Sequence, residues 1–296
     1  MKARMSIVVV MALACGLCAT GIGEEPKPNA GRDRPVRIGA VAYSPHAVTI
    51  FNGLTRYLNQ HDFRSDYVLY SNYGALVEAL DRGEVDIAWN TPLAHARYHV
   101  RNECSSRTLV MRDVDFHVRS VLVARADAGI ASLDDLPGKT LILGSSQAAE
   151  ATVLPVHLLK QEGVEFDKLR IVRLDKEFDS EGNPCASPRH VLAALRAGRG
   201  DAGIITQGLW QRLEKQSSAS GLVRVWTSPP FSHCVFTASA DFDQRKGARF
   251  TELMAAMDPQ DPATRDVMRL EGTRKWLPGS PEGFEQLVEA LRETQD

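Results

Sequence analysis

The sequence lacks a charge excess of either sign, because 35 lysines and arginines face 37 aspartates and glutamates over 296 residues. A net charge of −2 creates no long-range field that would attract nucleic acid, and no arginine-rich run or aromatic stacking motif compensates for it. Charged residues make up 24% and hydrophobic residues 44% of the chain, which excludes a disordered or fibrous protein. We therefore expect a globular protein that does not bind nucleic acid.

The motifs of common catalytic classes are also absent. The chain has no Gly-x-Ser-x-Gly nucleophile elbow, no His-Glu-x-x-His zinc helix and no Gly-x-x-x-x-Gly-Lys-Ser/Thr phosphate loop. We predict no catalytic residue, and we do not expect an enzyme.

No hydrophobic run reaches the roughly 20 residues that a membrane-spanning helix needs. The longest candidate, residues 7–17, is interrupted by glycine and cysteine and follows the basic residues Lys2 and Arg4. A short apolar run between basic and small residues is typical of a secretory signal. We therefore predict a signal peptide over residues 1–23 and an exported protein.

The segment around and after this run suggests how the protein is tethered. Leu13-Ala14-Cys15-Gly16 is similar to a bacterial lipoprotein box, in which Cys15 would become the lipidated first residue. Residues 24–34 are rich in proline, glycine and charge, so we expect a flexible leader there. A lipid anchor at Cys15 is the membrane contact that the sequence leaves open.

Cysteine is scarce, with five in the chain and only Cys104, Cys185 and Cys234 beyond the leader. An exported protein can oxidise two of these to a disulfide, but an odd number leaves at least one thiol. Sequence spacing does not decide which two would pair, so the pairing stays open.

Two stretches of the chain, residues 79–89 and 194–205, repeat one pattern. In each, a predicted helix stops at a glycine, a tight turn follows, and Asp86 or Asp201 opens a short apolar strand. The repeat suggests two similar α/β lobes. Because ligands of open α/β sheets bind at the carboxyl ends of strands, we expect the site in a cleft between the lobes.

Strand and helix signals alternate through most of the chain, which favours mostly parallel sheets covered by helices. We predict an α/β fold with two lobes, residues 35–118 plus 228–296 and residues 119–227, joined by a two-strand hinge. The expected strands span residues 36–41, 67–70, 85–89, 108–113, 120–124, 140–143, 171–174, 201–205, 223–226 and 235–238. The expected helices include residues 47–59, 73–81, 188–197, 249–257, 262–270 and 281–293, and a helix that starts after residues 144–147 and reaches residue 161.

Four parts of the chain, taken in order, carry a resemblance to a known family. They are the opening strand with Tyr43-Ser44-Pro45, residues 73–89, residues 120–127 with 132–139, and residues 190–205. Over about residues 36–240, the chain resembles the phosphonate-binding family of periplasmic solute-binding proteins, which serve ABC importers. The resemblance implies the type II two-lobe fold, a periplasmic location and hinge closure around a small ligand.

The resemblance also implies the partners. An ABC permease would read the closed, ligand-bound form, and a membrane sensor kinase is the alternative reader of the same form. An enzyme that uses the same cleft is a weaker alternative. We expect the protein to act as a monomer.

The chain departs from the family where the resemblance places an anion. Members open a helix of the second lobe with Ser-Thr-Ser-Gly shortly before a proline, and these hydroxyls help to hold the oxyanion. Counting back from Pro155, the corresponding residues are Ala148, Ala149, Glu150 and Ala151. The hydroxyls are missing, and a carboxylate at Glu150 would oppose an anion.

A second departure concerns the Gly-Ser-His segment that members place before a later helix. It becomes Ser187-Pro188-Arg189-His190, in which Arg189 would offer a fixed positive charge or would simply be solvated. The resemblance thus implies a small polar ligand of the phosphonate or phosphate type, and it leaves a related oxyanion or an amine-bearing molecule open.

Polar residues at the predicted strand ends and helix starts are the candidate ligand-binding residues. Tyrosine offers a ring face and a hydroxyl, while the shorter polar side chains offer hydrogen bonds beside the free N–H groups of helix N-termini. Each also has a structural alternative, as a helix cap or a packed loop residue. The candidates are Tyr43, Ser44, Tyr73, Asn90, Thr91, Ser120, Ser145, Ser146, Gln147, His190, Thr206 and Gln207.

One pattern is reminiscent of a metal site. His95, His99 and Glu103 recur every four residues on a predicted helix, with Cys104 next to them, so their ligand atoms could converge on a soft or borderline ion. A solvated helix face beside Arg97 is the alternative, and three such residues on one helix rarely complete a site. We predict no metal site and no resident cofactor.

Overall fold

The structure is a computed structural model that describes residues 34–175 and 187–293. The predicted signal peptide, the lipoprotein box and nearly all of the predicted leader lie outside the described residues, as does Cys185. Within the described residues, no helix is both long and apolar enough to cross a membrane.

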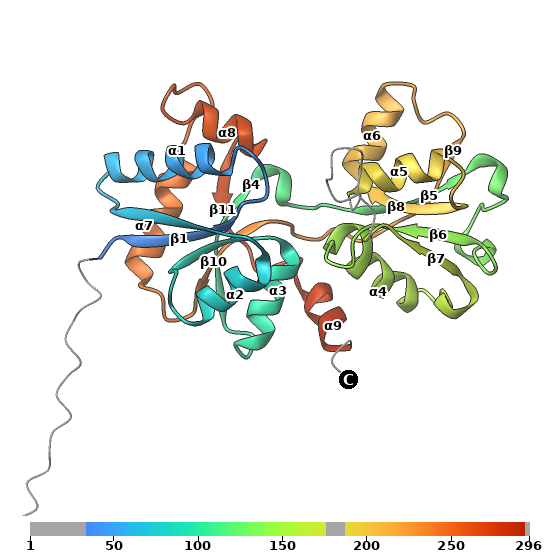
Figure 1. The fold of residues 1–296 in the computed structure, drawn as a ribbon, viewed down its shortest axis with the longest axis horizontal. Coiled ribbons are helices and arrows are strands. Elements are labelled where there is room, and N and C mark those ends of the chain that lie inside the picture. The colour runs from blue at the N-terminus through green and yellow to red at the C-terminus, as the bar shows by residue number, and fades with distance from the viewer. Residues whose placement is uncertain (1–33, 176–186, 294–296) are drawn as a thin grey trace, which may run out of the picture. The chain divides into compact units, whose positions relative to one another are not determined.

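The first sheet has six strands in the order β11-β4-β10-β3-β1-β2 (Figure 1). Helices α1, α7 and α8 cover one of its faces, where Phe51, Phe250 and Met268 are buried, and α2 and α3 cover the other. Its strands are β1 (Val36–Val41), β2 (Ser65–Tyr70), β3 (Ile87–Asn90), β4 (Ser106–Arg112), β10 (Val235–Ser239) and β11 (Trp276–Pro278). Its helices are α1 (Ala47–Gln60), α2 (Tyr73–Asp81), α3 (Pro92–Arg101), α7 (Gln244–Ala255) and α8 (Arg265–Glu271).

The second sheet has five strands in the order β7-β6-β8-β5-β9. Helices α5 and α6 pack on one face, and α4 packs on the other after a π-helical turn, η4 (Ala149–Val153). Its strands are β5 (Ser120–Arg125), β6 (Thr140–Leu143), β7 (Arg170–Arg173), β8 (Ala202–Thr206) and β9 (Leu222–Thr227). Its helices are α4 (Leu154–Gln161), α5 (Pro188–Arg196) and α6 (Gln207–Lys215).

The repeated sequence pattern has one structural cause. In the first sheet the Asp86 carboxylate accepts the backbone N–H of Arg37 at 2.7 Å, and in the second the Asp201 carboxylate accepts that of Thr140 at 2.7 Å. Each aspartate thereby fastens the start of its strand, β3 or β8, to the neighbouring parallel strand. Gly83 and Gly198, with φ of 67° and 73°, make the left-handed turns that precede these strands.

The sheets are mixed, so the expectation of mostly parallel sheets is wrong in this detail. In the first sheet β1 is parallel to β2 and β3, but β10 and β11 run antiparallel to their neighbours. In the second, β5 is antiparallel to both β8 and β9. The antiparallel pairs of β5 and β10 arise because these two strands enter their sheets directly from the connections between the sheets, without a crossover helix.

The C-terminal helix α9 (Glu285–Glu293) packs against both α3 and α4. Its Leu287 joins a buried cluster that contains Leu93 of α3 and Leu158 of α4, so helices from both sheets share one apolar core. This helix begins later than the predicted residues 281–293, and β11 lies in a segment that carried no strand prediction. The predicted lobe boundaries stay a prediction.

Candidate functional site

Two segments connect the sheets, one from β4 to β5 and one from β9 to β10. Val118 and Phe231 exchange two backbone hydrogen bonds of 2.9 Å, and the Ser228 N–H donates to the Ser120 carbonyl at 2.9 Å. Nearby, the backbone N–H of His233 donates to the Asp115 carbonyl at 2.8 Å. The antiparallel pairing of the segments thus places Asp115, in the short helical turn η1 (Asp113–Asp115), beside His233.

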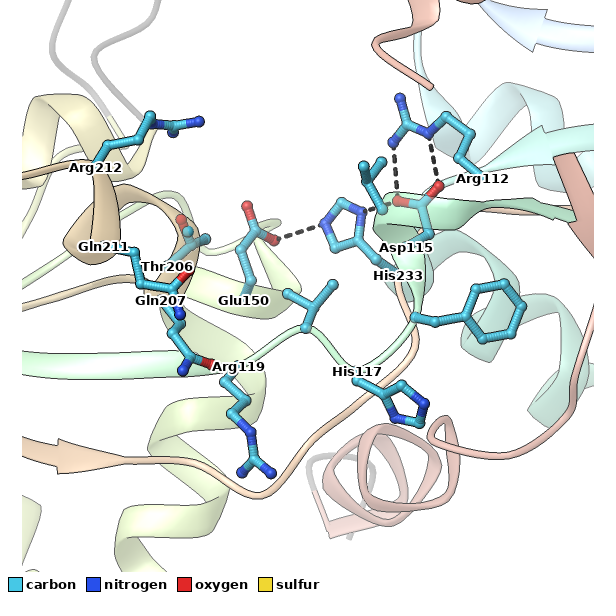
Figure 2. Close-up of a pocket in the computed structure, with 14 residues that line it drawn as sticks. Arg112, Asp115, His117, Arg119, Glu150, Thr206, Gln207, Gln211, Arg212 and His233 are labelled. Carbon is cyan, nitrogen blue, oxygen red and sulfur yellow. Dashed lines mark hydrogen bonds and ion pairs between the residues drawn. The ribbon is translucent and has the colours of Figure 1, made fainter. Parts of the chain in front are cut away.

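A cavity of about 630 Å³ opens beside these connections (Figure 2). One wall comes from the end of β4, η1 and the first connection, and the opposite wall comes from η4 and the N-terminal part of α6. Its polar lining consists of Arg112, Asp115, His117, Arg119, Glu150, Thr206, Gln207, Gln211, Arg212 and His233. Three arginines against two carboxylates leave this lining with one positive charge before the histidines are counted.

Polar contacts cross the cavity in a continuous chain. Arg112 donates two hydrogen bonds to the Asp115 carboxylate, at 2.6 and 2.9 Å, and Asp115 Oδ1 lies 3.2 Å from His233 Nδ1. On its other side, His233 Nε2 lies 3.6 Å from Glu150 Oε2 (Figure 2). Residues near the first sheet are therefore linked by an ion pair to the turn that opens α4.

The series of polar contacts continues behind Arg112 into the first sheet. Arg112 Nη1 donates to the Glu271 carbonyl at 2.8 Å and lies 3.3 Å from its carboxylate, which accepts the Tyr43 hydroxyl. The guanidinium also lies over the Trp89 ring, 5.3 Å from its centroid. Arg112 is thus held by two carboxylates and one aromatic ring.

These contacts shift the pKa values of His233, Glu150 and Asp115. Burial alone would lower the pKa of His233, but Cys234, Asp115 and Glu150 together raise it well above its ordinary value. Burial would likewise raise the pKa of Glu150 and of Asp115, yet the hydrogen bonds and charges of their cationic partners hold both below the usual range. The contacts across the cavity are therefore between charged groups at neutral pH.

Thr206 and Gln207 are the predicted site residues that line the cavity. Thr206 is the N-cap of α6, and its hydroxyl accepts the Leu209 N–H at 3.3 Å. Ser120 lies behind Glu150, because its hydroxyl donates to the Glu150 carbonyl at 2.6 Å. These three residues shape the wall that the second sheet contributes.

The predicted site residues of the first sheet lie elsewhere. Tyr43 reaches the chain of contacts through Glu271, Ser44 accepts the His46 N–H at 3.2 Å, and Thr91 caps α3. Asn90 is buried, and its side-chain oxygen and nitrogen have no hydrogen-bond partner among the described residues. Tyr73 is the first residue of α2, and burial raises its pKa. Their ligand contacts stay a prediction.

Ser145, Ser146 and Gln147 form a loop before η4 and do not cap a helix directly. The helical segment begins at Ala149, shortly after the predicted residues 144–147, and runs through η4 and α4 to Gln161. Ser145 Oγ accepts the Gln147 N–H at 3.1 Å, and the Gln147 side chain accepts a hydrogen bond from Arg97 at 2.7 Å. Ala148 is the N-cap of the π-helical turn, and this turn brings Glu150 to the cavity. His190 forms a capping pair with Ser187 at the start of α5.

The sequence analysis missed Arg112, Asp115 and His233. They belong to no motif, and they meet only because two connections far apart in the sequence pair with each other. The available signal was a concentration of polar residues, Arg112 to Asp115 and Ser232 to Cys234, at the ends of strands on both sides of the connections.

The pattern around His95 is not the solvated face that the sequence allowed. His95 is buried with Nδ1 2.9 Å from the Thr237 hydroxyl, and its ring stacks on that of His99 at 5.9 Å. Helix α3 ends at Arg101, so Glu103 and Cys104 lie beyond it, with positive φ angles of 53° and 61°. Cys104 accepts a hydrogen bond from Arg292 at 2.8 Å and, like Cys234, is a free thiol.

Two sheets, each covered by helices, are joined by two connections that pair with each other beside a polar cavity. This arrangement defines the class of two-lobe binding proteins, which close on a ligand by hinge motion. A family model described as "ABC transporter, phosphonate, periplasmic substrate-binding protein" matches residues 39–284, and the chain belongs to this family. It is accordingly an exported, periplasmic substrate-binding protein of the transport type.

Solved structures share its fold. PhnD1 from Prochlorococcus marinus, in complex with methylphosphonate, is 18% identical with a TM-score of 0.65 over 88% of this chain and 98% of its own. XAC2383 from Xanthomonas citri, bound to ATP, has the same identity and coverages and a TM-score of 0.68. The aliphatic sulphonate-binding protein SsuA from Escherichia coli is 15% identical, with a TM-score of 0.56 over 88% and 93% of the chains. These likenesses identify the type II two-lobe fold.

Proposed function

We propose that the protein captures a small solute with an oxyanion group in the cavity and delivers it to an ABC permease. The observation that carries this proposal is the positive lining, to which Arg119 of the first connection and Arg212 of α6 contribute beside the residues that open α6. Guanidinium groups bind oxyanions through paired hydrogen bonds, and a helix N-terminus adds free N–H groups and a favourable dipole. The relatives that bind methylphosphonate and aliphatic sulphonates support the same class of solute.

We infer that the oxyanion lies on the α6 side of the cavity. Gly208, the second residue of α6, has no atom within 4 Å of the position that a Cβ would occupy, so solvent reaches the backbone of this turn. Arg119 uses one guanidinium nitrogen to donate to the Ser228 carbonyl at 2.7 Å, which leaves its other donors for a ligand. On the other side, the Glu150 carboxylate lies where the family resemblance places anion-binding hydroxyls.

Glu150 favours a solute that also carries an amine. The Glu150 carboxylate repels an anionic group of a solute, but it stabilises an ammonium group through a charge-assisted hydrogen bond. We therefore propose an amine-bearing oxyanion, with the anionic end near Arg119 and Arg212 and the cationic end near Glu150. A simple oxyanion would pair with the two arginines but would offer no cationic group to Glu150.

We infer that the protein binds its solute without transforming it, and that a permease reads the closed form. The transport character of the family supports both statements. A sensor kinase as the partner, a monomeric state and a lipid anchor at Cys15 stay predictions from the sequence.

Calorimetric titration tests this proposal. Purified protein, with EDTA present, is titrated with 2-aminoethylphosphonate, methylphosphonate, phosphate and ethanolamine, and we expect the first of these to bind most tightly. Arg119→Gln and Arg212→Gln should each weaken that binding by about tenfold, or about 1.4 kcal/mol. Arg245→Gln, an exposed arginine on α7, is the matched control and should change nothing. Binding of none of these oxyanions, or unchanged binding in both cavity variants, would overturn the proposal.

A further inference from the structure

Asp115, His233 and Cys234 bring three kinds of metal-ligating atom to one point. A carboxylate oxygen, an imidazole nitrogen and a sulfur from these residues all lie within 4.8 Å of one another. His233 Nδ1 is 3.2 Å from Asp115 Oδ1 and 3.2 Å from Cys234 Sγ. The convergence involves two segments that are more than a hundred positions apart in the sequence, so it is a property of the fold.

The spacing of these donors suits a tetrahedral ion. Zinc holds sulfur at about 2.3 Å and nitrogen or oxygen at about 2.0 to 2.2 Å, which sets neighbouring donor atoms about 3.3 to 3.6 Å apart. The two distances around His233 Nδ1 are slightly shorter than this range. The Asp115 oxygen and the Cys234 sulfur lie within 4.8 Å of each other, so small shifts of these two side chains would admit an ion.

The surroundings fix the three donors. The backbone hydrogen bond of 2.8 Å from His233 to Asp115 ties the two segments together. Arg112 holds the Asp115 carboxylate from behind with two hydrogen bonds, which leaves a lone pair of Oδ1 directed toward His233. Glu150 lies 3.6 Å from His233 Nε2, where a carboxylate can accept the Nε2–H of a histidine whose Nδ1 binds a metal.

We propose that Asp115, His233 and Cys234 form a binding site for a borderline divalent metal ion, with Zn²⁺ as the ion that fits best. Thiolate, neutral imidazole and carboxylate are ligands that Zn²⁺ takes together, and the thiolate and carboxylate neutralise its two charges. Binding displaces the thiol proton of Cys234 and the proton on His233 Nδ1, both of which pass to the buffer.

The ion would sit beside the connections between the sheets. Asp115 lies near the start of the first connection and His233 and Cys234 lie at the end of the second, so one ion would clamp both. Asp115 and His233 also line the cavity, so the fourth coordination position would face it and hold a water molecule. This inference goes beyond the proposed function and does not depend on it.

Titration of the purified, EDTA-stripped protein with Zn²⁺, in a buffer without oxyanion solutes, tests the site directly. We expect one Zn²⁺ to bind, and Co²⁺ in its place to show the charge-transfer absorption of a cobalt–thiolate bond. Cys234→Ser should abolish that absorption and weaken Zn²⁺ binding by at least about tenfold, and His233→Gln should weaken it similarly. Cys104→Ser is the matched control, because Cys104 is the other free thiol of the described residues and is similarly half-buried.

Three results would overturn the proposal: no Zn²⁺ binding, a cobalt spectrum without thiolate absorption, or binding that is lost in Cys104→Ser and kept in Cys234→Ser. The cobalt spectrum of the unmodified protein tests the thiolate without any substitution, so a variant that fails to fold does not decide the question. Because the metal titration contains no oxyanion and the solute titration contains EDTA, either proposal can fail while the other stands.

Discussion

Arg112 illustrates at the scale of one residue how a buried charge is kept. Its side chain is 18% exposed, and it pairs with the carboxylates of Asp115 and Glu271, whose side chains are each 3% exposed. Although burial alone would lower the pKa of Arg112, these carboxylates raise it above its usual range. Removal of the guanidinium would take the cationic partner from buried Glu271 and would leave Asp115 with His233 alone.

We expect Arg112→Met to lower the free energy of unfolding by about 3 to 5 kcal/mol, because an uncompensated buried charge costs that much. Arg269→Met is the control, since the pair of Arg269 with Asp266 is exposed on both sides and is worth less than about 1 kcal/mol. Urea unfolding of both variants measures the difference. Equal effects of the two substitutions would show that the buried network contributes nothing special.

His95 gives a second prediction at this scale, through pH. Burial, followed by the nearby His99, lowers the pKa of His95 from 6.5 to about 3. A histidine with a depressed pKa in the folded state stabilises the protein above the unfolded pKa and loses that contribution as the pH falls from 6.5 toward 3.

We therefore expect His95 to account for a loss of about 2 kcal/mol in the free energy of unfolding between pH 7 and pH 5. Unfolding by urea at both pH values, in the protein and in His95→Gln, isolates this contribution. The variant should be less sensitive to pH by that amount. An identical pH dependence in both proteins would mean that His95 is not held neutral by burial.

At the scale of elements, local signals predicted most strands. β1 and β6 coincide with the predicted residues 36–41 and 140–143, because each is a short apolar run between polar residues. β11 escaped prediction because only three residues, of which the last is a proline, form it at the edge of the sheet. β11 forms a strand only through its pairing with β4, which no local sequence pattern reveals.

The candidate site was harder to predict than the fold. Glu150 was identified because a carboxylate stands where related sequences have hydroxyls, and Thr206 because a repeated strand ends there. Asp115 and His233 depend on the long-range pairing of the two connections, and the sequence carries no signal for that pairing. A site built across such connections needs the tertiary structure before its residues can be named.

At the scale of elements, β1 and α2 pack closely against each other at Gly39. A Cβ at Gly39 would lie 2.5 Å from Leu76 Cδ1 and 3.1 Å from both methyl groups of Val85, all in packed surroundings. We expect Gly39→Ala to destabilise the protein by about 1 to 3 kcal/mol through overpacking.

Gly208→Ala is the opposite case, because no atom lies within 4 Å of the new methyl group and the residue belongs to α6. Alanine there should stabilise the protein by about 0.4 to 1 kcal/mol, since it reduces the freedom of the unfolded chain. Thermal unfolding of the two variants should shift in opposite directions. A shift in the same direction would contradict the close approach at Gly39.

At the scale of the whole molecule, the two sheets do not have wholly separate cores. Leu287 of α9 belongs to the cluster that joins Leu93 of α3 with Leu158 of α4, and α9 packs on both helices. The connecting segments add paired backbone hydrogen bonds between Val118 and Phe231. A ligand-driven hinge motion in this molecule must therefore take place around a shared apolar contact.

We expect this sharing to make the two sheets unfold together. Leu287→Ala should unfold in a single calorimetric transition, and its free energy of unfolding should be lower by about 2 to 5 kcal/mol, the usual cost of such a core truncation. Leu213→Ala removes a buried leucine of the cluster that belongs to the second sheet alone, and it should lower the same single transition. Two transitions, of which Leu213→Ala shifts only one, would show that the sheets are independent folding units and that α9 does not couple them.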